Sequence, residues 1–276
     1  MVKKLMWLVV LLAVTVTPLQ ADLRVVSRLD VRKIADADPG NPFLAMVGNA
    51  MAQQFEQMNG MTTTTVIGDG VIRTEMSRAV PGMAEGTITI MRADGTMLGI
   101  NPADETYFRA TMPDVSQLAA LGMMPTVTVD RTGEFSTLLD YRVERVTLEM
   151  TMPLPVPPEA RDQLPPGLPT EIRMTIENWT AEALETYGTQ MLRGNPMMSA
   201  LGLEAVADIG FALRQVVTSE LFAGYEMETT VTSVAEEDLP EALFEVPEGY
   251  REVPAPAGFG GGRGAGSLID KPTGAR

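Results

Sequence analysis

The stretch that decides the fold reads TTTTVIGDGVIRTEM over residues 62–76 and GTITIMRADGTMLGINPADETYFRAT over residues 86–111. Apolar and polar residues alternate here with a period of two, as expected of strands that bury one face. GDG at 68–70 and ADG at 93–95 separate the alternating runs, and Asp-Gly supplies the positive φ angles of a tight hairpin turn. With a further turn at NPADE (101–105), this stretch predicts a continuous antiparallel meander.

Strands are also predicted before and after the meander, because β-branched and alternating apolar residues recur there. They are expected at 23–34, 126–131, 141–152, 171–179, 211–221 and 225–234. Between the strands expected at 141–152 and 171–179, residues 153–169 contain seven prolines and predict a stiff loop. We expect the two strands that flank this loop to pair. The segment DLPEALFEVPEGYREV (238–253) should close the domain.

Three segments predict helices. One ends at Met58, after apolar residues at three- and four-residue steps. A second is expected at 114–121, with Asp114 as N-cap and Gly122 after its end. Residues 180–208 predict two short helices, interrupted at 194–196 by Gly-Asn-Pro.

The first 21 residues have the order of a secretory signal peptide: Lys3 and Lys4, an apolar run from Leu5 to Val16, then Pro18 and the small residue Ala21. An uncleaved anchor is the alternative, but a spanning helix needs about 20 apolar residues. We therefore expect residues 1–21 to be a signal peptide and residues 22–253 one exported domain in the periplasm. The Gly-rich residues 254–276 are expected to be a disordered tail.

The composition limits the chemistry. The chain has 36 Asp and Glu against 21 Lys and Arg, a net charge of −15, and neither cysteine nor histidine. An acidic surface repels nucleic-acid phosphates. Without Cys or His, the commonest zinc ligands and the Ser-His-Asp and Cys-His nucleophile systems are missing, and no lipoprotein-type anchor is possible. We expect no cofactor, no nucleic-acid partner, no stable membrane span after cleavage and no enzymatic activity.

Several local patterns have a structural explanation as well as a chemical one. Asp36 and Asp38 resemble a calcium loop, but Val47 replaces the closing carboxylate, which favours a solvated turn. The 20 methionines can fill the core, line an adaptable apolar pocket, or bind Cu(I), and core filling is favoured first. Acidic pairs such as Glu144 and Glu149 are interpreted as solvent-facing strand residues. Asn178-Trp-Thr matches the glycosylation sequon, which is usually silent in bacteria.

The sequence resembles the uncharacterised exported domain family grouped with the LolA-like lipoprotein-carrier superfamily. The resembling segments are TVIGDGVIRTEM, IMRADGTMLGINPADETYF, DYRVERVTLEM, ENWTAE and LPEALFEVPEGYREV. The resemblance implies an α+β fold, a strongly curved antiparallel β-sheet (half-barrel) with helices covering its concave face. In the carriers that cavity takes acyl chains. The proline-rich loop and the Gly-rich tail depart from the family pattern.

Two functions follow as expectations. The first is a non-enzymatic binding or carrier module whose apolar cavity accepts a lipid or other hydrophobic molecule, because such pockets are mostly apolar. Its candidate ligand-binding residues are Leu148, Met150, Met152, Met174, Ile176, Trp179 and Met227. The second is an envelope interaction protein, in which the cavity is a filled core and the loop or tail engages a partner protein.

Overall fold

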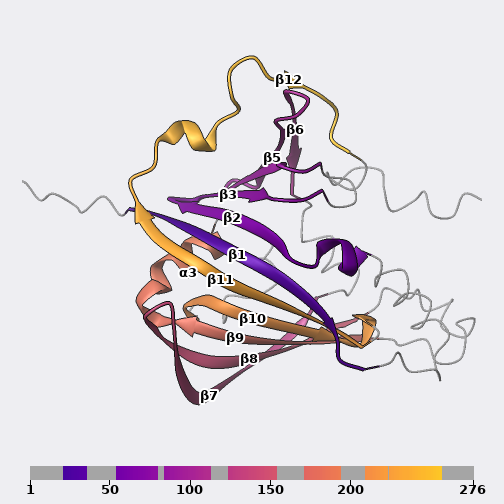
Figure 1. Cartoon of the computed structure of the whole chain (residues 1–276), viewed down its shortest axis with the longest axis vertical. Coiled ribbons are helices and arrows are strands. Elements are labelled where there is room, and N and C mark those ends of the chain that lie inside the picture. The colour runs from indigo at the N-terminus through magenta and orange to yellow at the C-terminus, as the bar shows by residue number, and fades with distance from the viewer. Residues whose placement is uncertain are drawn as a thin grey trace, which may run out of the picture.

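The fold is described from a computed structural model, which places residues 21–35, 54–79, 84–112, 124–153, 171–193, 209–222 and 224–256. These residues form one 12-stranded sheet with few helices (Figure 1). Its strands are β1 (Asp22–Lys33), β2 (Met61–Gly68), β3 (Val71–Met76), β4 (Ile88–Arg92), β5 (Thr96–Asn101), β6 (Thr106–Thr111), β7 (Thr126–Leu138), β8 (Tyr141–Pro153), β9 (Glu171–Ala181), β10 (Phe211–Ser219), β11 (Tyr225–Glu237) and β12 (Arg251–Glu252).

The helical elements are short. They are α3 (Glu185–Arg193) and the 3-10 turns η2 (Glu182–Leu184), η4 (Glu220–Phe222) and η5 (Glu241–Phe244). Residues 54–58 are also helical, at the end of the first predicted helix. None of the helices in the described ranges is both long and apolar enough to cross a membrane.

The predicted meander is confirmed. Strands β2 to β6 pair in chain order, each antiparallel to the next. Gly68 pairs with Val71, so Asp69 and Gly70 alone form the first turn, and Gly70 has a φ of 65°. Gly95 after Asp94 has a φ of 81°. The glycines of both turns therefore adopt the left-handed conformation that the Asp-Gly pattern predicts for them.

The second half of the chain forms another antiparallel run, β7 to β11. The expected pairing across the proline-rich segment is confirmed, since β8 pairs with β9 from Val143↔Ala181 to Pro153↔Glu171. Strand β7 is longer than the predicted 126–131: it passes a register shift between Arg131 and Phe135 and continues to Leu138. The hairpin therefore extends past the segment in which the alternation is clear.

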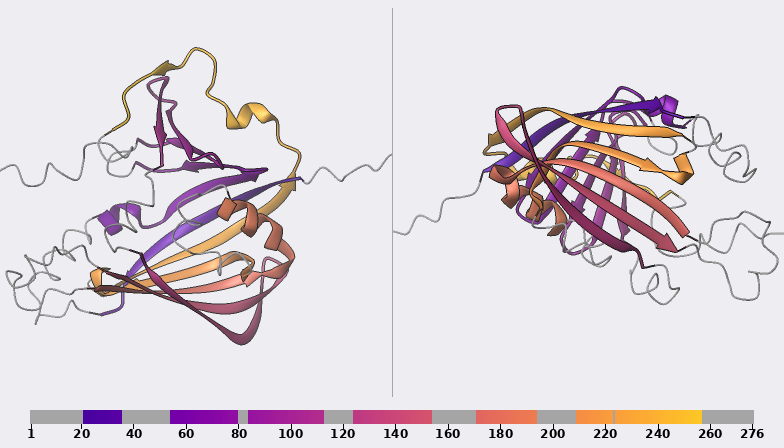
Figure 2. Two further views of the ribbon diagram at one scale, coloured as in Figure 1. Left: turned by 180° about the vertical axis from the view of Figure 1, so that it is seen from behind. Right: turned by 90° about the horizontal axis from the view of Figure 1, so that it is seen from below.

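Strand β1 joins the two runs. It pairs with β2 on one side and with β11 on the other, giving the order β12-β6-β5-β4-β3-β2-β1-β11-β10-β9-β8-β7. Figure 2 shows that the joined sheet is strongly twisted and curved, so that its two ends turn toward one another. Apart from the short parallel pair β12–β6, every pair is antiparallel.

We call the face of the sheet against which α3 packs the inner face. Leu184 and Tyr187 there meet buried residues of several strands. This inner cluster contains Leu23, Val25, Ile67, Val143, Ala181, Leu184, Tyr187, Phe211, Leu213 and Val231. In the left view of Figure 2, α3 lies in front of the sheet, on the side turned away in Figure 1. Helix α3 thus covers one end of the inner face.

The opposite, outer face carries a second cluster. The chain leaves β11 and crosses β2 to β6, where η5 inserts Phe244 among buried strand residues. This outer cluster contains Val66, Val71, Ile90, Leu98, Ile100 and Phe244. Arg92 donates to the Phe244 carbonyl and pairs with Glu245, and β12 then pairs along β6. The segment predicted to close the domain thus straps the outer face.

Several predicted features lie outside the described residues. They are the signal peptide up to residue 20, the turn with Asp36 and Asp38, the helix at 114–121, the proline-rich loop from residue 154, and the second helix after residue 194. Most of the tail lies outside them too. Of the predicted helices, α3 and the end of the first helix at residues 54–58 are therefore described.

Candidate ligand-binding face

A row of apolar side chains crosses six strands of the sheet. Register pairs Val31 with Met227, Met227 with Val217, Val217 with Ile176, Ile176 with Leu148 and Leu148 with Val129. Paired residues on neighbouring strands point to the same face. Because side chains alternate along a strand, Val31 shares the inner face with Leu23 and Val25 of β1. On β1 the row therefore shares the face of the inner cluster, whereas on β8 and β9 the inner-cluster residues Val143 and Ala181 are out of phase with it.

The row broadens toward β8 and β9. Met150 pairs with Met174 two residues further along these strands, and Met152 pairs with Ile172 two residues beyond that. Leu148 is 4% exposed and belongs to a small cluster with Val146 and Ile209. The other residues of the row and its extension are half-buried. This apolar face brings six of the seven predicted ligand-binding residues together: Leu148, Met150, Met152, Met174, Ile176 and Met227.

Trp179 is the seventh, and the fold places it elsewhere. It is three residues from Ile176 on β9 and so out of phase with the apolar row. The indole packs against the inner cluster, and its buried N–H has no acceptor in the described part of the chain. Alternation along TIENW (175–179) indicates that Trp179 and Ile176 point to opposite faces of the strand.

The buried sequon residue also lies beside this face. Asn178 is 4% exposed, and its carboxamide oxygen accepts a hydrogen bond of 2.9 Å from Gln215 Nε2 on β10. An asparagine held in this way does not present its amide to a glycosylating enzyme in the folded chain. The side chain serves the packing of the sheet.

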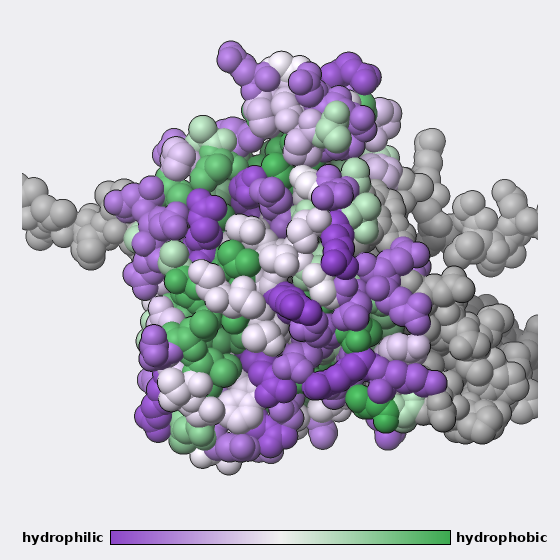
Figure 3. All heavy atoms as spheres, viewed as in Figure 1, coloured by the Kyte–Doolittle hydropathy of each residue, from purple (hydrophilic) through white to green (hydrophobic). Residues whose placement is uncertain are grey.

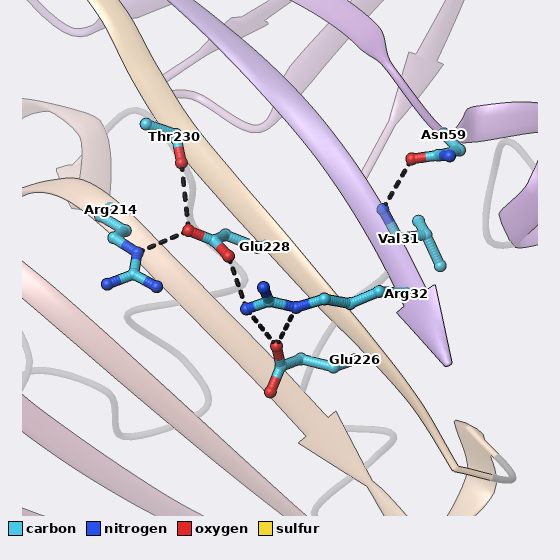
Figure 4. Close-up of polar contacts among 7 residues, drawn as sticks. All are labelled: Val31, Arg32, Asn59, Arg214, Glu226, Glu228 and Thr230. Atoms are coloured by element: carbon cyan, nitrogen blue, oxygen red, sulfur yellow. Dashed lines mark hydrogen bonds and ion pairs between the residues drawn. The ribbon is translucent and has the colours of Figure 1, made fainter. Parts of the chain in front are cut away.

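Charged residues occupy the outer face of the same strands. In Figure 4, Glu228 accepts from Arg214 Nε at 2.6 Å and pairs with Arg32 at 2.7 Å, while Arg32 also reaches Glu226. The hydrogen bond from Arg214, which outweighs partial burial, lowers the pKa of Glu228. Figure 3 shows hydrophilic residues gathered toward the C-terminal end of β1. Each strand here is thus apolar inward and ionic outward.

Two larger cavities are found away from the apolar row. One of about 680 Å³ lies beside the β7–β8 hairpin, and half of its lining residues are charged, among them Arg131, Asp140, Arg142 and Glu144. Another of about 940 Å³ lies where β1 begins, next to the strap. Among the described residues that line these cavities, none is a predicted ligand-binding residue. The apolar face is a half-buried surface and not the wall of either cavity.

No metal centre emerges from the described residues, because no three Asp or Glu side chains among them converge as a cation would need. The acidic pairs noted in the sequence separate on the strands. Glu144 pairs with Arg131, and Glu149 is exposed. These two carboxylates therefore do not form a shared acid–base site.

No family model matches the chain, and no curated protein matches it. Among solved structures, the LolA superfamily protein NE2245 from Nitrosomonas europaea aligns with 82% of this chain and 90% of its own, at 7% identity and a TM-score of 0.32. A likeness at this level assigns neither a family nor a ligand to the chain.

Proposed function

We propose that this chain is a periplasmic, non-enzymatic binding or carrier protein whose apolar row of strand residues accepts a lipid or another hydrophobic molecule. The observation that supports the proposal is the apolar row from Val31 to Val129, which is continuous over six strands and only half-buried for most of its length. Helices over this face would serve as its lid.

The energetics suit such a ligand. Removing apolar surface from water contributes roughly 25 cal/mol per Å², and the contribution does not depend on orientation. Four of the predicted residues are methionines, whose unbranched side chains adapt to irregular apolar shapes. Small-ligand sites are mostly apolar with a few polar groups, and Asn178 and Gln215 stand at the border of the row. The face thus suits a flexible hydrophobic molecule more than a rigid polar one.

Native mass spectrometry of the protein purified from its own periplasm tests the proposal. We expect a copurifying mass that is released by organic solvent and identified as a lipid or other hydrophobic compound. Met174→Glu places a charge on the apolar face and should abolish the copurifying mass. Thr175→Glu is the matched control, because Thr175 is the next residue of β9 and is exposed. Loss from both variants, or from neither, would contradict the proposed site.

An envelope interaction protein is the second candidate. The β7–β8 hairpin favours it, since Phe135 is 50% exposed and Leu139 is 40% exposed on the outermost long strand pair. The same purification separates the two functions. An empty monomer that retains an envelope protein, and loses it on Phe135→Ser, would support interaction over ligand carriage.

A further inference from the structure

The sheet begins at the first residue after the predicted signal peptide. Asp22 opens β1 and pairs with Glu237 of β11. Its carboxylate accepts the backbone N–H of Leu239 at 3.3 Å, where the chain turns from β11 into the strap. Removing Asp22 would therefore leave this turn without its acceptor.

The peptide bond before Asp22 lies next to a buried tyrosine. Tyr187 of α3 is 5% exposed, and its hydroxyl donates to the carbonyl oxygen of Ala21 at 3.1 Å. The carbonyl oxygen and the amide nitrogen of one peptide bond are about 2.3 Å apart. The nitrogen of Asp22 is thus fixed close to the Tyr187 hydroxyl.

This region has an excess of acceptors and negative charge. The cavity of about 940 Å³ opens at Ala21 and Asp22 and is lined by four further carboxylates, those of Asp69, Asp238, Glu241 and Glu245. Arg92 is the cation among the described lining residues, and it is held by the Phe244 carbonyl and Glu245. Gln190 also lines the cavity, and its buried Oε1 atom has no donor in the described part of the chain.

The crowding of charge changes the titration of nearby groups. Burial, together with the carboxylate of Asp238, raises the pKa of Asp22 despite the hydrogen bond from Leu239. Burial, and then the carboxylates of Glu236 and Asp22, raise the pKa of Tyr187. A cation at the start of β1 would oppose both effects.

We propose that the chain is cleaved between Ala21 and Asp22 and that the α-ammonium group left on Asp22 is bound beside Tyr187 by the carboxylates of Glu236 and Asp238. In the cleavage a signal peptidase adds water across the peptide bond. The hydroxyl goes to the Ala21 carbonyl carbon, and the nitrogen of Asp22 takes a hydrogen and then a proton from solvent.

Among the possible mature N-termini, the contacts of β1 favour the one at Asp22. A mature chain that kept residues before Asp22 would carry its ammonium group away from the carboxylates of Glu236 and Asp238, and an uncharged peptide group would remain beside them. A chain cut after Asp22 would lose the acceptor for Leu239. Cleavage at Asp22 supplies the missing cation and keeps every described contact of the β1 side chains.

The first test is the intact mass of the protein after expression of the full chain in a Gram-negative host and recovery from the periplasm. We expect the mass of a chain that begins at Asp22. A mature chain that begins at any other residue, or one that keeps residues 1–21, would overturn the assignment of the cleavage point.

The second test measures the ammonium group itself. An unperturbed α-amino group has a pKa of about 7.7 to 8.0, and each unit by which pairing raises it lowers the reactive neutral fraction tenfold. With an amine-acylating reagent at pH 7, we expect the α-amino group of the folded protein to react about tenfold more slowly than in urea. Equal rates would overturn the proposal.

Slow acylation could also come from steric cover alone, so a charge variant is the control. Glu236→Gln with Asp238→Asn keeps the shapes of the side chains and should restore fast acylation, whereas Glu149→Gln on β8 should not.

If the double variant does not fold, chemical modification of the α-amino group in the wild-type protein provides the test. Acetylation of the α-amino group should lower the urea midpoint, while reductive methylation, which retains the charge, should leave it unchanged. Equal midpoints for the two modifications would overturn the ammonium's role.

Discussion

Val66 and Ile67 are neighbours in β2 and are both 0% exposed, yet they belong to hydrophobic clusters on opposite faces of the sheet. Ile67 belongs to the cluster that contains residues of β1, β8, β10 and α3, while Val66 belongs to the cluster that contains Phe244 of the strap. Since successive strand residues point to opposite faces, both can be buried only where the sheet is covered on both sides. Strand β2 is therefore the place where the two halves of the core meet.

The strap should be essential for stability. Phe244 is 7% exposed in the outer cluster, and truncating a buried phenylalanine to alanine typically costs roughly 3–5 kcal/mol. Phe244→Ala should lower the free energy of unfolding by that amount in urea denaturation followed by circular dichroism. Glu241→Ala changes an exposed residue of the same 3-10 turn and should change it by about 0.5 kcal/mol or less. Similar small effects for both variants would show that the strap is not part of the core.

The ionic network around Glu228 should make stability depend on acid. The pKa of Glu228 is lowered in the folded state from the model-compound value of 4.5, so the folded chain binds this proton less readily than the unfolded chain. The stabilisation is present above pH 4.5 and is lost as the pH falls through the lower, folded-state pKa. Glu228→Gln should therefore flatten the dependence of the urea midpoint on pH below 4.5. Glu149→Gln, at an exposed position of β8, should leave the wild-type slope, and an unchanged slope in Glu228→Gln would contradict this role.

Gly99 should not tolerate a side chain. It pairs with Phe108 across β5 and β6, and a Cβ atom at Gly99 would overlap the Phe108 ring. Gly99→Ala should cost about 1–3 kcal/mol, as expected for overpacking. In a Phe108→Ala background the same change should cost much less, because the ring is gone. A double-mutant cycle on the free energy of unfolding measures this coupling, and simple additivity would refute it.

Asn178 should matter for stability even if it is never glycosylated. Asn178→Leu leaves Gln215 Nε2 without its acceptor on β9, and an unpaired buried polar group costs about 1–3 kcal/mol. Combining Asn178→Leu with Gln215→Leu should recover part of the loss, since both polar partners are then removed. Thermal denaturation of the three variants checks this. An equal or greater loss in the double variant would mean that the hydrogen bond is not the cause.

Local chemistry in the sequence determined the hairpins. Alternation at 62–76 and 86–111 and the Asp-Gly turns at Gly70 and Gly95 predict β2 to β6, and the structure confirms them. These features depend on residues close in the chain, where turn geometry sets the register. The pairing of β8 with β9 was likewise predictable, because two apolar alternating strands flank the proline-rich segment. Six candidate ligand residues share a face for the same reason.

Only the tertiary structure decided how the two meanders join and what covers each face. Nothing local pairs Asp22 with Glu237, and the burial of Val66 depends on Phe244, which lies far along the chain. The phase of Trp179 relative to Ile176 was present in the sequence, but the cluster against which it packs was not. Alternation indicates that a strand has a buried face, whereas the partner that buries it is chosen by packing over the whole chain.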